Sequence, residues 1–166
     1  MQPQISPTEH STDDILALVG GTPLLEIHYR YDGAPRRLYA KYESMNMTGS
    51  TKDRMAAHIL RHALAHGELE PGDRIVEATS GNTGIAFAAL GRALGHDVRI
   101  YMPDWMSPER KALIQSFGAE IVPISKEEGG FLGSIARAAA EADERDDVFL
   151  PRQFESAANP EAHELG

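Results

Sequence analysis

Apolar and polar residues alternate along the chain with two different periods, and the longest stretch of helical period covers residues 51–66. Apolar residues recur there every three or four positions and form one stripe, at Met55, Ile59, Leu60, Ala63 and Leu64. That spacing predicts a helix with one buried face. Ser50 precedes this helix as an N-cap, and Gly67 follows it, where a glycine closes many helices.

Further along the chain, short apolar runs alternate with helical segments. Strands are predicted at residues 74–78, 98–102, 120–124 and 148–150, and helices at residues 84–94, 107–117 and 131–142. Ser107, Pro108 and Glu109 open the second of these helices with a cap, a first-position proline and an acidic first turn. Regular alternation of strand and helix predicts an α/β fold, in which helices flank a parallel sheet.

The two ends of the chain lack this alternation. Residues 1–11 are polar and contain two prolines, which predicts a loose arm. A short helix at residues 12–18 and two strands at residues 24–29 and 38–42, separated by a turn at residues 32–35, are expected next. Residues 152–166 show no core pattern of their own, and the chain stops soon after a strand begins. We therefore expect an interrupted, truncated architecture.

Composition narrows the function classes. Hydrophobic residues make up 42% of the 166 residues and charged residues 25%, as in globular proteins. The chain has no cysteine, which excludes disulfides and thiolate metal sites and fits the reducing cytoplasm. A net charge of −9 argues against binding nucleic acid or an anionic membrane through the overall field. No stretch reaches the roughly 20 apolar residues of a membrane span, and the N-terminus does not read as a secretory signal.

Lys52 lies in the first turn of the helix at residues 51–66. The positive end of the helix dipole disfavours an ammonium there. A lysine kept neutral is a nucleophile that can form a Schiff base. Surface lysines are usually solvated, so position alone also allows a Lys52 that simply points into water.

A second candidate is the loop with the sequence Thr-Ser-Gly-Asn-Thr-Gly at residues 79–84, which follows a predicted strand and opens a predicted helix. Small residues let a ligand approach the backbone, and the free N–H groups at a helix start bind carboxylate or phosphate. The same residues would also make an ordinary, well-capped turn between a strand and a helix.

Together the two segments resemble the family of pyridoxal-phosphate (PLP) enzymes that includes cysteine synthase and cystathionine β-synthase. The resemblance rests on the run Gly-Ser-Thr-Lys-Asp-Arg at residues 49–54 and on Glu-Ala-Thr-Ser-Gly-Asn-Thr-Gly at residues 77–84. Shorter matches at residues 21–24, 117–120, 153–154 and 159–160 follow in the family's order. The resemblance covers the chain from about Ile15 to its end.

This resemblance implies roles for individual residues. Lys52 would bind PLP covalently and later act as the base for the α-proton, and Asn82 would hydrogen-bond the phenolic oxygen of the cofactor. The carboxylate of an amino-acid substrate would be held by Thr79, Ser80, Gly81, Thr83 and Gln153. No metal is implied. PLP would supply the electron sink, and the protein would supply positioning and electrostatics.

The resemblance also implies a reaction. The motif at residues 79–84 resembles the β-replacement branch, in which an O-activated serine exchanges its leaving group for a sulfur nucleophile, as in cysteine biosynthesis. The family implies a homodimer in the cytoplasm. Met47-Thr48 and Thr51 depart from the usual residues around the lysine, which leaves the exact substrate open. A serine or threonine dehydratase and a non-catalytic remnant that serves as a binding module are the alternatives.

The resemblance further implies a tryptophan synthase β-like fold in two domains. Residues 1–40 would be an arm and strands of the larger domain, residues 41–146 the small α/β domain with Lys52, and residues 147–166 an incomplete return to the larger domain. The family's glycine-rich loop for the PLP phosphate has no counterpart here, since Gly20-Gly21 and Gly129-Gly130 lack its pattern. We therefore expect this polypeptide alone to be a poor or inactive catalyst.

Two weaker signals have ordinary explanations. His58, His62 and His66 are spaced four apart and could chelate a metal, but an exposed helix face opposite the apolar stripe is the favoured interpretation. Trp105 lies in an apolar loop and is expected to pack at a surface, or to belong to a lid.

Overall fold

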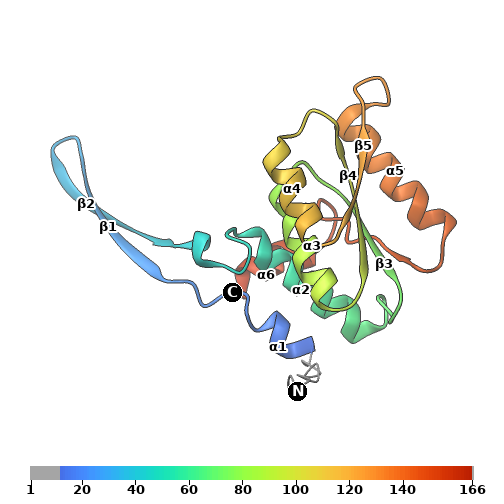
Figure 1. The fold of residues 1–166 in the computed structure, drawn as a ribbon. Helices are drawn as coiled ribbons and strands as arrows, with labels where there is room; N and C mark the ends of the chain where they lie inside the picture. Colours follow the sequence, from blue (N-terminus) through green and yellow to red (C-terminus); the bar gives the residue numbers. More distant parts are fainter. Residues whose placement is uncertain (1–11, 166) are drawn as a thin grey trace, which may run out of the picture.

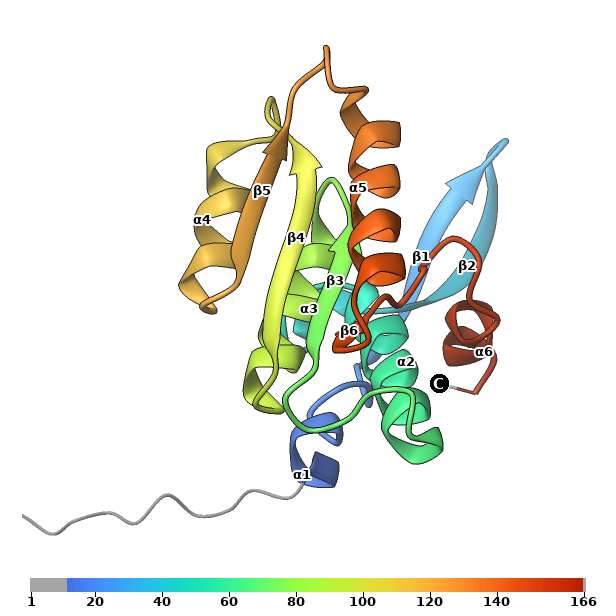
Figure 2. The same ribbon diagram turned by 90° about the vertical axis from the view of Figure 1, so that its right-hand side faces the viewer.

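The computed structural model describes residues 12–165, and its centre is a four-stranded sheet (Figure 1). All four strands are parallel and run in the order β5-β4-β3-β6, namely β5 (Glu120–Ile124), β4 (Asp97–Pro103), β3 (Arg74–Ala78) and β6 (Val148–Phe149). Helix α5 (Gly130–Glu144) covers one face, while α3 (Asn82–Ala93) and α4 (Pro108–Ser116) cover the other (Figure 2). The predicted α/β fold with a parallel sheet flanked by helices is confirmed.

The order of the strands follows from the handedness of the connections. Crossovers between parallel strands are nearly always right-handed. The chain moves outward from β3 to β4 and β5 with α3 and α4 on one face, then returns over the other face through α5 and adds β6 beside β3. The direction of winding therefore changes between β3 and β6. Ligands of open α/β sheets bind beyond the carboxyl ends of the strands at such a switch point.

Helix α3 lies unusually close to the sheet. Its residues from Thr83 to Gly91 are all buried, and Phe87 is fully enclosed. A β-carbon placed on Gly91 would lie 2.7 Å from Val98 Cγ2, and one on Gly84 would lie 2.6 Å from Thr79 Cγ2. Because neither glycine has a side chain, α3 can lie directly against the sheet, with Gly84 at its start and Gly91 near its end.

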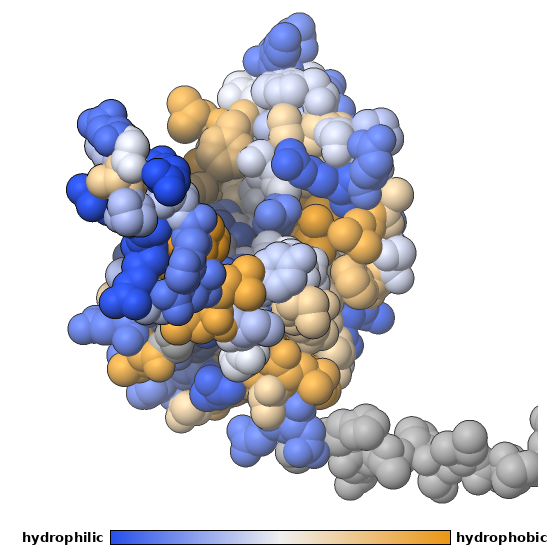
Figure 3. Space-filling model, turned by 90° about the vertical axis from the view of Figure 1, so that its left-hand side faces the viewer, coloured by the Kyte–Doolittle hydropathy of each residue, from blue (hydrophilic) through white to orange (hydrophobic). Residues whose placement is uncertain are grey.

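The N-terminal third contains α1 (Thr12–Leu16), a two-stranded antiparallel hairpin of β1 (Leu24–Tyr31) and β2 (Ala34–Lys41), and the 3-10 turn η1 (Glu43–Met45). The hairpin projects from the body of the molecule (Figure 1). Asp32 and Gly33 connect its strands, with φ of 48° and 74°, as a two-residue turn with both central residues left-handed requires. β2 therefore begins four residues earlier than predicted. The face shown in Figure 3 is hollowed beside this hairpin.

The tail contains a helix that was not predicted. Residues 152–165 include α6 (Ala158–Glu164), which packs on α2 (Lys52–His66) and buries Ala162 in the main core. Pro160 is compatible with this helix because it lies in the first turn, where no backbone N–H is needed. The pattern was missed because the helix has two turns and the one residue it buries is a small alanine.

The remaining local predictions differ by a few residues. Helix α2 begins at Lys52 rather than Thr51, and the Ser50 hydroxyl accepts the Lys52 backbone N–H at 3.2 Å. Gly67 closes α2 in a left-handed conformation, with φ of 68°. Helix α3 begins at Asn82 rather than Gly84, so Asn82 and Thr83 belong to its first turn.

The histidines of α2 make separate contacts. His58 interacts with Glu161 of α6 at 3.2 Å, while the rings of His62 and His66 stack with centroids 4.0 Å apart. Within residues 12–165, no group of three or more histidine or acidic side chains is arranged to hold a metal ion. In the same range, no helix is both long and apolar enough to cross a membrane.

Candidate active site

A cleft of about 320 Å³ opens at the carboxyl ends of β3 and β6, which is the switch point of the sheet. All seven site residues singled out in the sequence line this cleft: Lys52, Thr79, Ser80, Gly81, Asn82, Thr83 and Gln153. They come from the start of α2, from the connection between β3 and α3, from the first turn of α3 and from the segment after β6. Segments far apart in the sequence therefore meet in one place.

The 79–83 loop is shaped by hydrogen bonds at its start and by the beginning of α3. The Thr79 N–H donates to the Tyr101 carbonyl at 3.1 Å, and the Thr79 hydroxyl accepts the Gly81 N–H at 3.2 Å. The Gly81 carbonyl accepts N–H groups from the first turn of α3. Ser80 and Asn82 are exposed, whereas Thr79 and Thr83 are buried. The loop thus offers side-chain hydroxyl and amide groups beside the unpaired N–H groups of a helix start.

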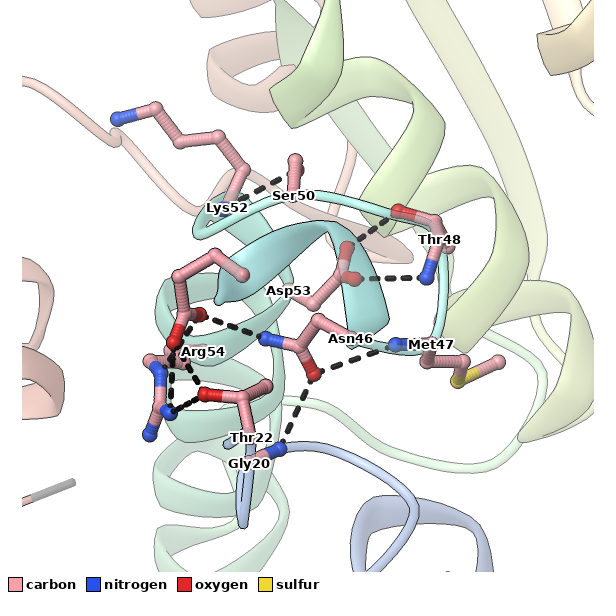
Figure 4. A network of polar contacts seen from close by, with 10 residues as sticks. Gly20, Thr22, Asn46, Met47, Thr48, Ser50, Lys52, Asp53 and Arg54 are labelled. Carbon is pink, nitrogen blue, oxygen red and sulfur yellow. Dashed lines mark hydrogen bonds and ion pairs between the residues drawn. The ribbon is translucent and has the colours of Figure 1, made fainter. Parts of the chain in front are cut away.

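Lys52 reaches the cleft from the first residue of α2 and is half-buried. Its amine makes no hydrogen bond or ion pair with any of residues 12–165. Figure 4 shows its side chain extended away from the neighbouring polar network. A primary amine without a protein partner is therefore available to a molecule in the cleft.

The start of α2 is held by Asp53, whose carboxylate is fully buried. It accepts the Thr48 backbone N–H at 2.7 Å and also the Thr48 hydroxyl. These contacts close residues 48–53 into a compact turn (Figure 4). The position of Lys52 is therefore set by its neighbour in sequence.

A second network fixes α2 to the segment that leads into the hairpin. Arg54 donates from Nε and Nη2 to the Glu43 carboxylate at 2.8 and 2.9 Å, and from Nη2 to the Thr22 hydroxyl at 3.0 Å. Asn46 joins Glu43 to the Gly20 N–H (Figure 4). The Arg54 guanidinium lowers the pKa of Glu43 to about 2. Glu43 and Asn46 were missed as supporting residues, because nothing local in the sequence marks an ion pair between segments.

Gln153 occupies the side of the cleft formed by the segment after β6. Its carboxamide oxygen accepts the Thr83 hydroxyl at 2.8 Å, and its Nε2 donates to the Ala78 carbonyl at 2.9 Å. Gln153 and the 79–83 loop are therefore joined directly.

Three further residues line the cleft that the sequence did not indicate: Arg110, Phe131 and Phe154. The rings of Phe131 and Phe154 meet edge to face at 5.9 Å and form an apolar wall. A β-carbon on Gly81 would lie 3.2 Å from Nε of Arg110, so the absence of a side chain there lets Arg110 pack against the loop. Among the described residues that line the cleft, Lys52 and Arg110 are basic and none is acidic, which favours an anionic ligand.

Comparison with known proteins places this geometry in a family. The family described as "Pyridoxal-phosphate dependent enzyme" matches residues 15–165. The chain belongs to this family.

Relatives within the PLP-dependent enzymes are similar over most of the chain. It is 42% identical to a cysteine synthase of Staphylococcus aureus over 153 residues, which are 92% of this chain and 49% of that protein. Among solved structures, a hydrogen sulfide-producing enzyme of Fusobacterium nucleatum is 54% identical with a TM-score of 0.89, over 93% of this chain and 46% of that one.

A cysteine synthase of Entamoeba histolytica is 36% identical with a TM-score of 0.80, over 98% of this chain and 50% of that one. The chain thus spans about half the length of the PLP-dependent relatives it matches.

Proposed function

We propose that this chain carries the lysine and carboxylate-binding half of a PLP-dependent enzyme that performs β-replacement on an O-activated serine. The observation that carries the proposal is the cleft at the switch point of the sheet, which is lined both by the 79–83 loop and by Lys52, whose amine has no partner among residues 12–165.

The residues of the cleft fit the aldehyde end of PLP. A primary amine without a protein partner is the group that an aldehyde requires, and the exposed carboxamide of Asn82 can donate to an oxygen on the cofactor ring. When bound, PLP supplies the electron sink for carbanion chemistry. We assign the phosphate group of the cofactor to no residue of this chain.

In the proposed reaction, Lys52 first holds the cofactor and then, once released from it, accepts the α-proton of the substrate at Nζ. Thr79, Ser80, Gly81 and Thr83 orient the substrate through its carboxylate, together with Gln153. Phe131 and Phe154 shield the apolar side of the cleft from water.

The names of the relatives favour a sulfur nucleophile, since they include cysteine synthases and a hydrogen sulfide-producing enzyme. An O-ureido-L-serine synthase with 38% identity indicates that the relatives include enzymes named for other serine derivatives. On the family resemblance, a serine or threonine dehydratase is the second candidate. On the family resemblance alone, the proposal extends to a homodimer in the cytoplasm.

Substitution of Lys52 by alanine tests the proposal. The protein with saturating PLP should show a visible absorbance band and at most slow conversion of O-acetylserine and sulfide to cysteine, because no residue of this chain is assigned to the PLP phosphate. Lys52→Ala should lose the band and slow turnover by about 10³-fold, because it removes both the attachment point and the base. Lys111→Ala, outside the cleft, is the control.

Two results would reject this assignment. Ammonia and a keto acid formed from serine or threonine without sulfide would indicate the dehydratase. A Lys52→Ala protein that behaves as the wild type in every assay would indicate the non-catalytic binding module.

A further inference from the structure

Glu77 is a charged residue at the end of the central strand, next to the candidate site but not lining its cleft. It lies on β3 and is only 3% exposed. Its carboxylate oxygens accept two backbone N–H groups, from Ala78 at 2.8 Å and from Gln153 at 3.2 Å. The second bond links positions 76 residues apart in the sequence.

Gln153 depends on this bond for part of its placement. The Gln153 N–H is held by Glu77, and its carbonyl accepts the Asn159 carboxamide at 2.8 Å. Its side chain bridges the Ala78 carbonyl and the Thr83 hydroxyl. The backbone N–H, the backbone carbonyl and both side-chain polar atoms of Gln153 therefore have partners. The bond to Glu77 is the one that involves a carboxyl group, and such a bond is the strongest of the four when the carboxyl group is ionised.

The backbone before Gln153 is in an unusual conformation. Arg152 has φ of 52°, a left-handed value that residues other than glycine rarely adopt. Such conformations persist where surrounding contacts hold them, and they concentrate at functional sites. Glu77 makes one of the contacts that hold the chain just after this position.

We propose that Glu77 is a positioning residue, which holds the backbone of Gln153 so that the Gln153 side chain reaches Thr83 at the edge of the cleft. This inference rests on the proposed function, in which Gln153 and Thr83 orient the substrate carboxylate. The burial that raises the pKa of Glu77 to about 7 makes a carboxyl group costly here, so a role in holding the site accounts for its presence.

Hydrogen exchange tests the contact itself and needs no cofactor. At pH 8 the Gln153 amide should exchange about tenfold or more faster in Glu77→Gln than in the wild type, because a bond to a carboxylate is lost or weakened. Glu141→Gln is the matched control. Glu141 is also buried and is held by Arg99 and by Tyr101 at 2.8 Å, but it does not line the cleft.

Binding of L-alanine, followed by the change in visible absorbance of the PLP-loaded protein at pH 8, tests the consequence for the site. The dissociation constant should rise about tenfold in Glu77→Gln and stay within about twofold in Glu141→Gln. If Glu77→Gln fails to fold, Asn159→Ala replaces it, since it releases the Gln153 carbonyl and should weaken L-alanine binding several-fold.

The two proposals fail in different ways. A wild-type protein with no Lys52-dependent absorbance would contradict the proposed function, while the exchange experiment would still report on Glu77. Normal wild-type binding, with L-alanine affinity unchanged in a folded Glu77→Gln or in Asn159→Ala, would overturn the positioning role alone. Equal weakening in Glu141→Gln would also overturn it, because the effect would then be a general loss of stability.

Discussion

At the scale of single residues, the site depends on groups that are held in place by neighbours outside the cleft. Lys52 is placed by Asp53 and Ser50, and Gln153 by Glu77 and Asn159. Lys52, Ser80 and Asn82 are half-buried or exposed, whereas Asp53 and Glu77 are almost fully enclosed. Substitutions of these supports should therefore change affinity and stability together.

The ionisation of Glu77 predicts a dependence of stability on pH. Burial raises its pKa to about 7 from an ordinary value of 4.5, so the folded protein binds a proton that the unfolded chain releases between these values. The stabilisation is fully present below about pH 4.5 and is lost as the pH rises through 7. The resulting loss in the free energy of unfolding is about 3 kcal/mol at most. The ionisation of Glu43 has the opposite effect on stability, because the pKa of Glu43 is lowered. The stability that it contributes is present above about pH 4.5 and is lost as the pH falls below that value.

Chemical denaturation of the wild type and of Glu77→Gln between pH 4.5 and 8 measures this effect. The decline in the free energy of unfolding with rising pH should be smaller in Glu77→Gln than in the wild type. Parallel curves for the two proteins would show that Glu77 titrates normally in the folded state.

At the scale of elements, helix α5 carries Phe131 to the cleft through a tightly packed N-terminal turn. A β-carbon on Gly133 would lie 2.1 Å from the Glu128 carbonyl oxygen, a backbone atom that cannot move aside easily. Replacing a helical glycine by alanine usually stabilises a protein by about 0.5–1 kcal/mol. Gly133→Ala should instead lower the free energy of unfolding by about 2 kcal/mol.

Leu132→Ala is the control for this substitution, because Leu132 is 76% exposed on the same turn and should change stability by less than about 0.5 kcal/mol. Thermal or urea unfolding measures both variants. A Gly133→Ala protein as stable as the wild type would mean that the turn can relax at no cost.

The elements that were predictable from sequence are those with a strong local period. The alternation of residues 74–150 predicted every strand of the four-stranded sheet and the helices that connect them, because short apolar runs and segments of helical period follow one another there. Helix α6 was not predicted, because Ala162 is the one residue that it buries and a single small apolar residue sets no helical period. Glu77 carried a usable signal, a carboxylate inside an apolar strand. The approach of Phe131, Phe154 and Arg110 to the loop depends on tertiary packing, which no local pattern encodes.

At the scale of the whole molecule, the sheet provides a rigid base and the change in winding direction provides the cleft. The resemblance named Lys52, the 79–83 loop and Gln153, and the fold brings all of them to one cleft. The hairpin of β1 and β2 forms a separate sheet and exposes several large apolar side chains. The division into a small and a larger domain stays a prediction, because the chain spans about half the length of its relatives.

The central claim is that the Lys52 amine and the Asn82 loop bind one aldehyde cofactor. Its most direct test is reduction of the PLP-treated protein with borohydride, followed by mass spectrometry of peptides that contain Lys41, Lys52, Lys111 or Lys126, which are all the lysines of the chain. We predict that the pyridoxyl group is found on Lys52 and that Asn82→Ala lowers its yield. Labelling spread evenly over the four lysines, or absent from Lys52, would contradict the account.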